Sequence, residues 1–344
     1  MNFYLDNIDC QKNEVHVLYW NRDLKPEDTS KYKGVEFHEF RQEQLDEVAR
    51  EKKLSSFAHY RNYANKLLRS MHFDKVIVLH SLPGLLVLDT LIRRYAYKYI
   101  LDYRDSTYEY FSPFRYTVGL LIKYSLCTFT SSDAFRKYFP KKYKGKIYTS
   151  HNILEDSLKH RKYKKSNSDK IRLAFWGQIR HEDVNKMLFD HIGNDERLEL
   201  HYYGREQQIA LNLKKYAMDK NYRNIYFHGE YLPEDRYEFV KNTDIIHNIY
   251  NDTNMLLAMG NKYYDGLIFR LPQVCMVGSF MGNLCEQNGV GCMLSPYDAK
   301  FSDKLVEYYK SLDIEKFRNN ADKALSDALL EYNAASNYLK ELFV

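Results

Sequence analysis

The chain has 344 residues, more than one typical hydrophobic core holds, so two domains are expected. Its 44% hydrophobic and 28% charged residues indicate a globular protein and exclude a disordered one. The net charge of +5 is too small to indicate nucleic-acid binding. The 32 tyrosines come with many lysines and asparagines, which is typical of an AT-rich genome rather than of a surface for stacking bases.

Five cysteines, none in a CxxC pair, indicate reduced thiols rather than a disulfide framework. The N-terminal residues lack an apolar signal core, and no run of 18 apolar residues occurs. We therefore expect a cytoplasmic protein without a membrane-spanning helix, able to lie peripherally on the inner face of the cell membrane.

In the first half, short apolar runs alternate with longer polar segments of helical period. The runs are almost continuously apolar, which is typical of strands buried on both faces of a parallel sheet. Helices are predicted over 43–71 and 82–98, which gives an open α/β domain. The predicted strands are EVHVLYW (14–20), KVIVLH (75–80), KYILDY (98–103), LCTFTSS (126–132) and GKIYTS (145–150).

Two basic stretches each allow two interpretations. LKHRKYKKSNSDK (158–170) indicates a solvated linker, or a basic edge facing anionic lipid. RKYFPKKYKGK (136–146) indicates a solvated loop, or a basic face on an anionic membrane. Neither resembles a nucleic-acid-binding module, so we expect no nucleic acid as a partner.

The second half repeats the alternation of strands and helices and ends in a helical segment over 322–343. Three of its strands end in or just before glycine, at Gly177, Gly204 and Gly229. Glycine at the carboxyl end of a parallel strand permits a tight turn and close approach of the backbone to a ligand. The predicted strands are IRLAFWG (171–177), LELHYYG (198–204), IYFHGEY (225–231), DIIHNIY (244–250), PQVCMV (272–277) and GCMLSP (291–296).

Taken in order, these segments resemble the nucleotide-binding half of GT-B-fold glycosyltransferases that build bacterial capsules, lipopolysaccharide and exopolysaccharide. The likeness covers roughly residues 170–335, and the first half resembles the acceptor half more loosely. The resemblance implies two Rossmann-like domains facing a central cleft, with a C-terminal helix that crosses back to the first domain. The segments that carry it are IRLAFWGQIR, LELHYYGRE, NIYFHGEYLPEDRYEFVKNTDIIHNIY, NKYYDGLIFRLPQVCMV and EQNGVGCML.

The expected boundaries follow from this comparison. Residues 1–157 form the acceptor-side domain, 158–170 the basic linker and 171–326 the nucleotide-sugar-binding domain, and 327–344 form the C-terminal helix. Relatives usually open with an apolar strand and a glycine-containing loop. Here MNFYLDNIDCQ (1–11) has helical character, so the first strand is expected to be shortened or missing.

The resemblance also implies donor-binding residues. In the helix that begins at Asn261, Asp265 matches the acid that hydrogen-bonds the ribose, and Lys262, on the same face, is placed to complement a diphosphate. The alternative is a surface ion pair between Lys262 and Asp265.

Gly177 matches the glycine whose backbone approaches the phosphates, and Gly204 ends the next strand. Relatives carry arginine and lysine where this chain has Gln178 and Asp183, so Arg180 and Lys186 are the available substitutes.

In the first half, the loop after YILDY supplies the catalytic candidates. Asp105 is a general base for an inverting enzyme, and Arg104 a partner for phosphate or an anionic acceptor. His80 ends the preceding strand at the same rim. Asp105 is equally well explained as a helix N-cap, and His80 as a structural histidine. Retaining relatives carry a second acid eight residues before the ribose-binding one; this chain has Leu257 there, so the stereochemistry stays open.

The expected function is that of a hexosyltransferase-like, sugar-nucleotide-dependent enzyme of cell-surface polysaccharide biosynthesis. The favoured donor is a UDP-sugar, and the acceptor is a glycan, expected to be lipid-linked. There is no HExxH, no DxD at a strand end and no His/Cys cluster in sequence, so no metal and no other cofactor are expected. The alternative is a GT-B-fold protein that has lost catalysis and acts as a binding or partner subunit.

Overall fold

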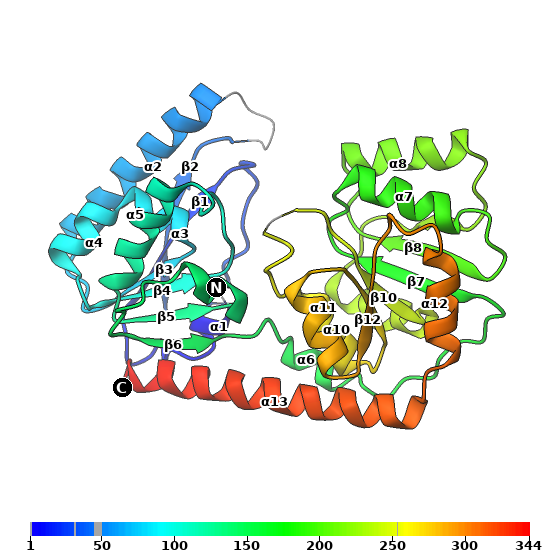
Figure 1. The fold of residues 1–344 in the computed structure, drawn as a ribbon. Coiled ribbons are helices and arrows are strands. Elements are labelled where there is room, and N and C mark those ends of the chain that lie inside the picture. The colour runs from blue at the N-terminus through cyan, green and yellow to red at the C-terminus, as the bar shows by residue number, and fades with distance from the viewer. Residues whose placement is uncertain (1, 31, 45–49, 253) are drawn as a thin grey trace. The chain divides into compact units, whose positions relative to one another are not determined.

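The computed structural model describes residues 2–30, 32–44, 50–252 and 254–344 and divides the chain into two compact units (Figure 1). One unit contains Met1–Ser150 and Glu331–Val344, and the other contains His151–Leu330. The long C-terminal helix α13 (Ile314–Glu341) begins in the second unit and ends in the first.

The first unit holds two parallel sheets. One has two strands, β1 and β2, and the other has four, in the order β3-β4-β5-β6. The five strands predicted in this half are confirmed, but β2, with the sequence VEFHEFR, was not predicted because charged residues interrupt its apolar pattern. The strands are β1 (Val15–Asn21), β2 (Val35–Arg41), β3 (Val76–Leu79), β4 (Tyr99–Tyr103), β5 (Cys127–Thr130) and β6 (Lys146–Thr149).

Helices pack on both sides of these strands. The predicted helix over 82–98 is two helices, α3 and α4, which meet at Val87. Tyr4 of α1 and Ile8, which follows this helix, bury against Phe129 of β5 and Leu339 of α13, so the first residues of the first unit and the last turns of α13 share one core. The helices are α1 (Asn2–Leu5), α2 (Arg50–Ser70), α3 (Ser81–Leu86), α4 (Leu88–Arg94), α5 (Ser112–Lys123) and the 3-10 helix η1 (Asp133–Tyr138).

The second unit is built on one six-stranded parallel sheet in the order β12-β11-β10-β7-β8-β9. Every residue of β7, IRLAFW, is buried, as expected for a central strand covered on both faces. All six strands predicted in this half are confirmed. They are β7 (Ile171–Trp176), β8 (Leu198–Tyr203), β9 (Ile225–Phe227), β10 (Ile245–Asn248), β11 (Gln273–Met276) and β12 (Gly291–Leu294).

Short helices connect these strands. They are α6 (Glu155–Leu158), α7 (Glu182–Ile192), α8 (Gln208–Asp219), η2 (Pro233–Asp235), α9 (Arg236–Phe239), η3 (Val240–Asn242), α10 (Asn261–Ile268), α11 (Phe280–Gln287) and α12 (Phe301–Lys310).

Residues 158–170 differ from the solvated linker considered above, because the second unit binds them. Arg161 donates to the carbonyl of Ile268 at 3.1 Å, and the hydroxyl of Tyr163 donates to the carbonyl of Phe269 at 2.9 Å. The amide of Ser166 donates to the carbonyl of Lys241 at 3.0 Å. The basic stretch is therefore part of the surface of the second unit.

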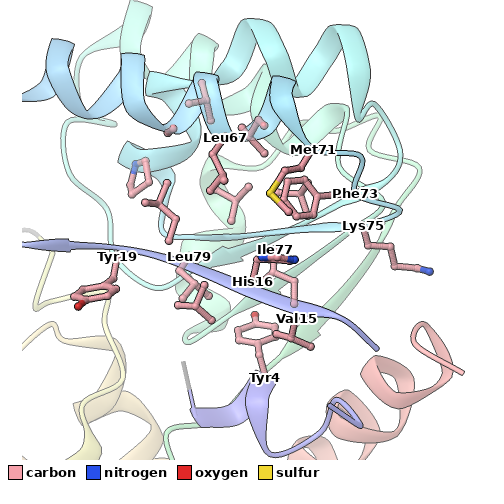
Figure 2. Close-up of a pocket in the computed structure, with 18 of the residues that line it drawn as sticks. Tyr4, Val15, His16, Tyr19, Leu67, Met71, Phe73, Lys75, Ile77 and Leu79 are labelled. Atoms are coloured by element: carbon pink, nitrogen blue, oxygen red, sulfur yellow. The ribbon is translucent and has the colours of Figure 1, made fainter. Parts of the chain in front are cut away.

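A cavity of about 1020 Å³ lies in the first unit between β1 and β3 (Figure 2). Consecutive residues of both strands line the cavity: 15–20 of β1, and 75–79 in and just before β3. Because successive side chains of a strand point to opposite faces of its sheet, the cavity runs along the edges of these strands rather than over one face. Among the described strands, β1 pairs with β2 and β3 pairs with β4. The facing edges of β1 and β3 are not joined by strand pairing.

Within the described residues, no helix combines the length and apolar character needed to cross a membrane.

Candidate functional site

The site in the second unit begins at the carboxyl end of the central strand β7. Gly177 has a φ of +125°, a conformation open to glycine, and its amide donates to the carbonyl of Tyr203 at 2.9 Å. The loop after β8 packs directly on it, because a Cβ atom at Gly204 would lie 2.0 Å from the carbonyl oxygen of Gly177. The two glycines predicted from the strand ends are therefore neighbours in space.

We expect Gly204→Ala to destabilise the protein by about 1–3 kcal/mol, because the added methyl group meets backbone rather than a flexible side chain. The unfolding free energy in urea measures this effect. Gly119→Ala, in helix α5, is the matched control: its Cβ would approach nothing closer than 3.8 Å, so this variant should be neutral or more stable. Equal stability of the two variants would contradict the close contact.

Lys262, one residue into α10, brings a positive charge to the Gly177 loop. Its Nζ lies 3.9 Å from the place that a Cβ atom on Gly177 would take. The ammonium group lies over the ring of Phe175 at 4.2 Å and near that of Tyr250 at 5.3 Å. Burial, assisted by the charge of Arg180 and opposed by that of Asp265, lowers the pKa of Lys262 to about 8.

His247 on β10 is a buried, neutral side chain near Lys262. Its ring lies 5.1 Å from that of Phe175, and neither ring nitrogen has a hydrogen-bond partner among the described residues. Burial, together with the charge of Lys262, lowers the pKa of His247 to about 3. Lys262 is therefore the cation at this position.

Asp265 lies one turn further along α10 and is buried. The indole N–H of Trp176 donates to Oδ2 at 2.8 Å, and the guanidinium of Arg236 donates to Oδ1 at 3.3 Å. Burial raises the pKa of Asp265, and the positive charge of Arg236 opposes this rise. The surface ion pair between Lys262 and Asp265 is therefore not formed. Each carboxylate oxygen has a further lone pair that can accept a hydroxyl proton.

The other predicted donor-binding residues are more scattered. Arg180 is exposed in the loop after Gly177 and donates to the side chain of Gln178. Lys186 lies on α7 with its ammonium group 2.7 Å from Glu182, an ion pair within the helix. Asn261 is exposed at the start of α10. The structure brings Gly177, Gly204, Lys262 and Asp265 together and directs Lys186 to Glu182.

The pKa of about 8 for Lys262 predicts how binding of a diphosphate depends on pH. The protonated amine attracts the anion, so affinity for UDP should fall as the pH rises from 7 through 8 to 9.5. Calorimetry across this range measures it, and Lys262→Arg, which stays charged, should give a flat profile. Because the folded pKa lies below the ordinary 10.5, this group should also make folding more stable as the pH rises from 8 to 10.5.

In the first unit, His80 and Asp105 come together at the carboxyl ends of β3 and β4, with His80 Nε2 4.0 Å from Asp105 Oδ2. His80 has a φ of +80°, an uncommon conformation for a residue with a side chain. Its Nδ1 accepts a hydrogen bond from the amide of Leu82 at 3.3 Å, so His80 caps α3. The helix after Asp105, α5, begins at Ser112 with Phe111 at its N-cap position, so the N-cap interpretation of Asp105 is wrong for this helix.

The side chain of Arg104 is bound by other residues of the first unit. It donates to the buried carboxylate of Asp102 at 2.7 Å and to the carbonyl and hydroxyl of Ser150 at 2.9 and 3.0 Å. These bonds direct its guanidinium group to β4 and to the end of β6.

Trp176 and Arg236, which hold Asp265, were not among the predicted residues. Trp176 could have been found from the sequence, because it directly precedes Gly177 at the end of a predicted strand. Arg236 had none, because it lies 29 residues before Asp265 in a different helix.

No protein-family model and no curated protein matches this sequence. Solved structures do match it. Sucrose-phosphate synthase from Thermosynechococcus elongatus aligns with a TM-score of 0.70 and 10% identity over 95% of this chain and 88% of that one.

Two further structures are similar. HepE from Anabaena, solved in complex with UDP and glucose, has a TM-score of 0.63 and 12% identity over 95% of this chain and 99% of its own. A trehalose-6-phosphate protein from E. coli, bound with UDP-2-fluoro glucose, has a TM-score of 0.66 and 10% identity over 97% of this chain and 92% of that one. At these identities the likeness shows the fold, and the predicted α/β fold of the GT-B type is confirmed.

Proposed function

We propose that this protein is a sugar-nucleotide-dependent glycosyltransferase, hexosyltransferase-like, which moves a sugar from a UDP-sugar to a glycan. The observation that carries the proposal is the Lys262 ammonium group beside Gly177, at the carboxyl end of a central parallel strand. Open parallel sheets bind their ligands at this edge. Similar structures were solved in complex with UDP, UDP-glucose and UDP-2-fluoro glucose.

Each donor-side residue has a chemical role in this proposal. Lys262 and the backbone amides of Asn261 and Lys262 at the start of α10 neutralise the diphosphate and stabilise the departing nucleotide without a metal ion. Gly177 lets the backbone approach the phosphates. Asp265, held by Trp176 and Arg236, accepts a hydrogen bond from a ribose hydroxyl. Arg180 supplies a second, exposed positive charge.

On the acceptor side, Asp105 acts as the general base if the sugar is inverted, and His80 orients its carboxylate. Their 4.0 Å separation is close enough for such a pair to shorten when an acceptor hydroxyl binds. Arg104 is not needed for this role, since Asp102 and Ser150 bind it.

We further propose that the acceptor is lipid-linked and belongs to cell-surface polysaccharide synthesis. The protein would then lie on the inner face of the membrane. Exposed lysines over 137–146 and exposed aromatic side chains before and on α5 support it, since both bind anionic lipid surfaces. The lysines are Lys137, Lys141, Lys142, Lys144 and Lys146. The aromatic residues are Tyr108, Tyr110, Phe111 and Tyr116. Flotation with liposomes should require anionic lipid; equal partitioning without it would contradict this part.

The test of the function is a panel of UDP-, GDP- and TDP-sugars with the purified protein. Slow release of UDP from a UDP-sugar, lost in Lys262→Met, supports the enzyme. Release of no nucleotide from any donor supports instead the partner subunit that has kept the fold and lost catalysis. Asp105→Asn separates the steps, because it should keep UDP binding and lose transfer.

A further inference from the structure

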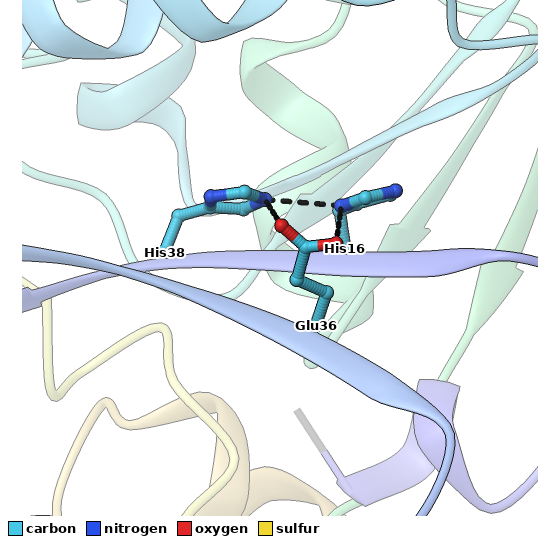
Figure 3. A group of neighbouring side chains, drawn as sticks. All are labelled: His16, Glu36 and His38. Atoms are coloured by element: carbon cyan, nitrogen blue, oxygen red, sulfur yellow. Dashed lines mark hydrogen bonds and ion pairs between the residues drawn. The ribbon is translucent and has the colours of Figure 1, made fainter.

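Three side chains with metal-binding atoms meet on the two-stranded sheet of the first unit. His16 comes from β1, and Glu36 and His38 come from β2 (Figure 3). The parallel register sets His16 opposite Glu36, and His38 follows two residues later on the same face. The two histidines are largely covered, with side-chain exposures of 5% and 16%, while Glu36 is 62% exposed.

The distances among these atoms fit one small cation. His16 Nδ1 lies 3.0 Å from His38 Nε2 and 3.6 Å from Glu36 Oε2, and His38 Nε2 lies 3.5 Å from Glu36 Oε1. Zinc–ligand bonds of about 2.0–2.1 Å at tetrahedral angles separate neighbouring ligand atoms by about 3.4 Å. The three residues therefore stand close to a coordinating arrangement on one side of the ion, with the fourth position left for water.

A fourth residue orients the first ligand. His16 Nε2 lies 3.0 Å from Glu14 Oε1, on the same strand. A histidine that binds a metal usually donates its other ring N–H to a carboxylate, which fixes the tautomer. With the proton on Nε2, the lone pair of His16 Nδ1 is directed toward His38 and Glu36.

The second unit contains the same arrangement with one residue changed. On β8 and just after β9, His201 Nδ1 lies 3.0 Å from His228 Nε2, and His201 Nε2 lies 3.3 Å from Glu199. The register places Tyr226 opposite His201, where β2 has Glu36. The tyrosine ring stacks on His201 at 4.8 Å. A histidine pair is therefore a structural feature of both units, and among the described residues the third ligand is present only in the first.

We propose that His16, Glu36 and His38 form a zinc site that fastens β1 to β2. Two imidazoles and a carboxylate are a donor set that suits Zn²⁺ better than Mg²⁺ or Ca²⁺. The proposal is independent of the glycosyltransferase function and revises the expectation that the chain binds no metal. The sequence did not indicate the site because its ligands lie on two strands, 22 residues apart at the histidines.

The test is titration of the full-length, EDTA-treated protein with Zn²⁺ by calorimetry, followed by thermal melting. We expect one equivalent of zinc and a melting temperature that rises with its concentration. Glu36→Gln should weaken binding at least about 100-fold without unfolding the protein, because this side chain is exposed; Glu14→Gln should weaken it by about 10- to 100-fold.

Tyr226→Glu tests the comparison between the two units and should raise the stoichiometry to two equivalents. Co²⁺ in place of Zn²⁺ reports on the ligands, since binding at the free cysteines would add thiolate charge-transfer absorption, which we do not expect. Absence of zinc binding or equal binding by Glu36→Gln would overturn the proposal, and a single equivalent in Tyr226→Glu would overturn the comparison between the two units. None of these outcomes depends on donor turnover.

Discussion

Lys262→Met is expected to weaken UDP binding at pH 7 by at least about 100-fold, equivalent to about 2.7 kcal/mol. The methionine keeps an apolar stem against Phe175 and Tyr250 but removes the half-buried charge that would meet the diphosphate. Calorimetric titration with UDP measures the loss. The unfolding free energy should not fall, because the folded protein no longer has to bury an ammonium group whose pKa burial has lowered.

The control is Lys186→Met, which removes another lysine that the sequence offered as a donor-binding candidate. Its ammonium group is already paired with Glu182, so UDP affinity should change less than about 3-fold, the range of a surface ion pair. Equal losses in the two variants would indicate a non-specific effect of net charge. Unchanged affinity in Lys262→Met would remove this lysine from the donor site.

Asp265→Ala is expected to destabilise the protein by about 3–5 kcal/mol, in addition to sharply weakening nucleotide binding. The substitution leaves the guanidinium of Arg236 and the indole N–H of Trp176 without the carboxylate that both contact. Chemical denaturation measures the stability. Calorimetry with UDP or GDP, below the melting temperature of the variant, measures the binding, and unchanged affinity would reject the ribose-binding role.

Two further variants separate structure from binding. Asp265→Asn keeps an acceptor for Trp176 and should lose less stability than the alanine variant. Asp265→Ala combined with Arg236→Met should recover part of the lost stability, because it removes the unpaired charge, but it should recover none of the nucleotide affinity. Recovery of both would show that Asp265 acts only through folding.

Much of the fold follows from the sequence because apolar runs of four to six residues that alternate with longer helical segments are typical of buried parallel strands. IRLAFW and YILDY could be located from the sequence because their residues are buried on both faces. VEFHEFR was missed for the opposite reason. Only one of its neighbours is a strand, so it keeps charged side chains such as Glu36 that a central strand would exclude.

The site was predictable in part. Gly177, Gly204 and Lys262 could be found because strand ends and helix starts fix backbone positions, and the structure brings them together. Whether a basic side chain is available for a ligand depends on its other contacts, which sequence does not give: Lys186 is bound by Glu182 and Arg104 by Asp102. The proposed zinc ligands Glu36 and His38 lie on β2, which was not predicted, so their position opposite His16 could not be predicted either.

The cavity between β1 and β3 has a consequence for how the first unit unfolds. In the part of the first unit that the structure describes, the β1–β2 pair shares no strand pairing with β3–β6, and two strands alone are marginally stable in water. This pair can therefore separate from the larger sheet at the cost of side-chain packing alone, while every backbone bond within β3–β6 remains intact. Partial unfolding of the first unit should accordingly begin at β1 and β2, and a metal ion held between them would raise the free energy of that opening.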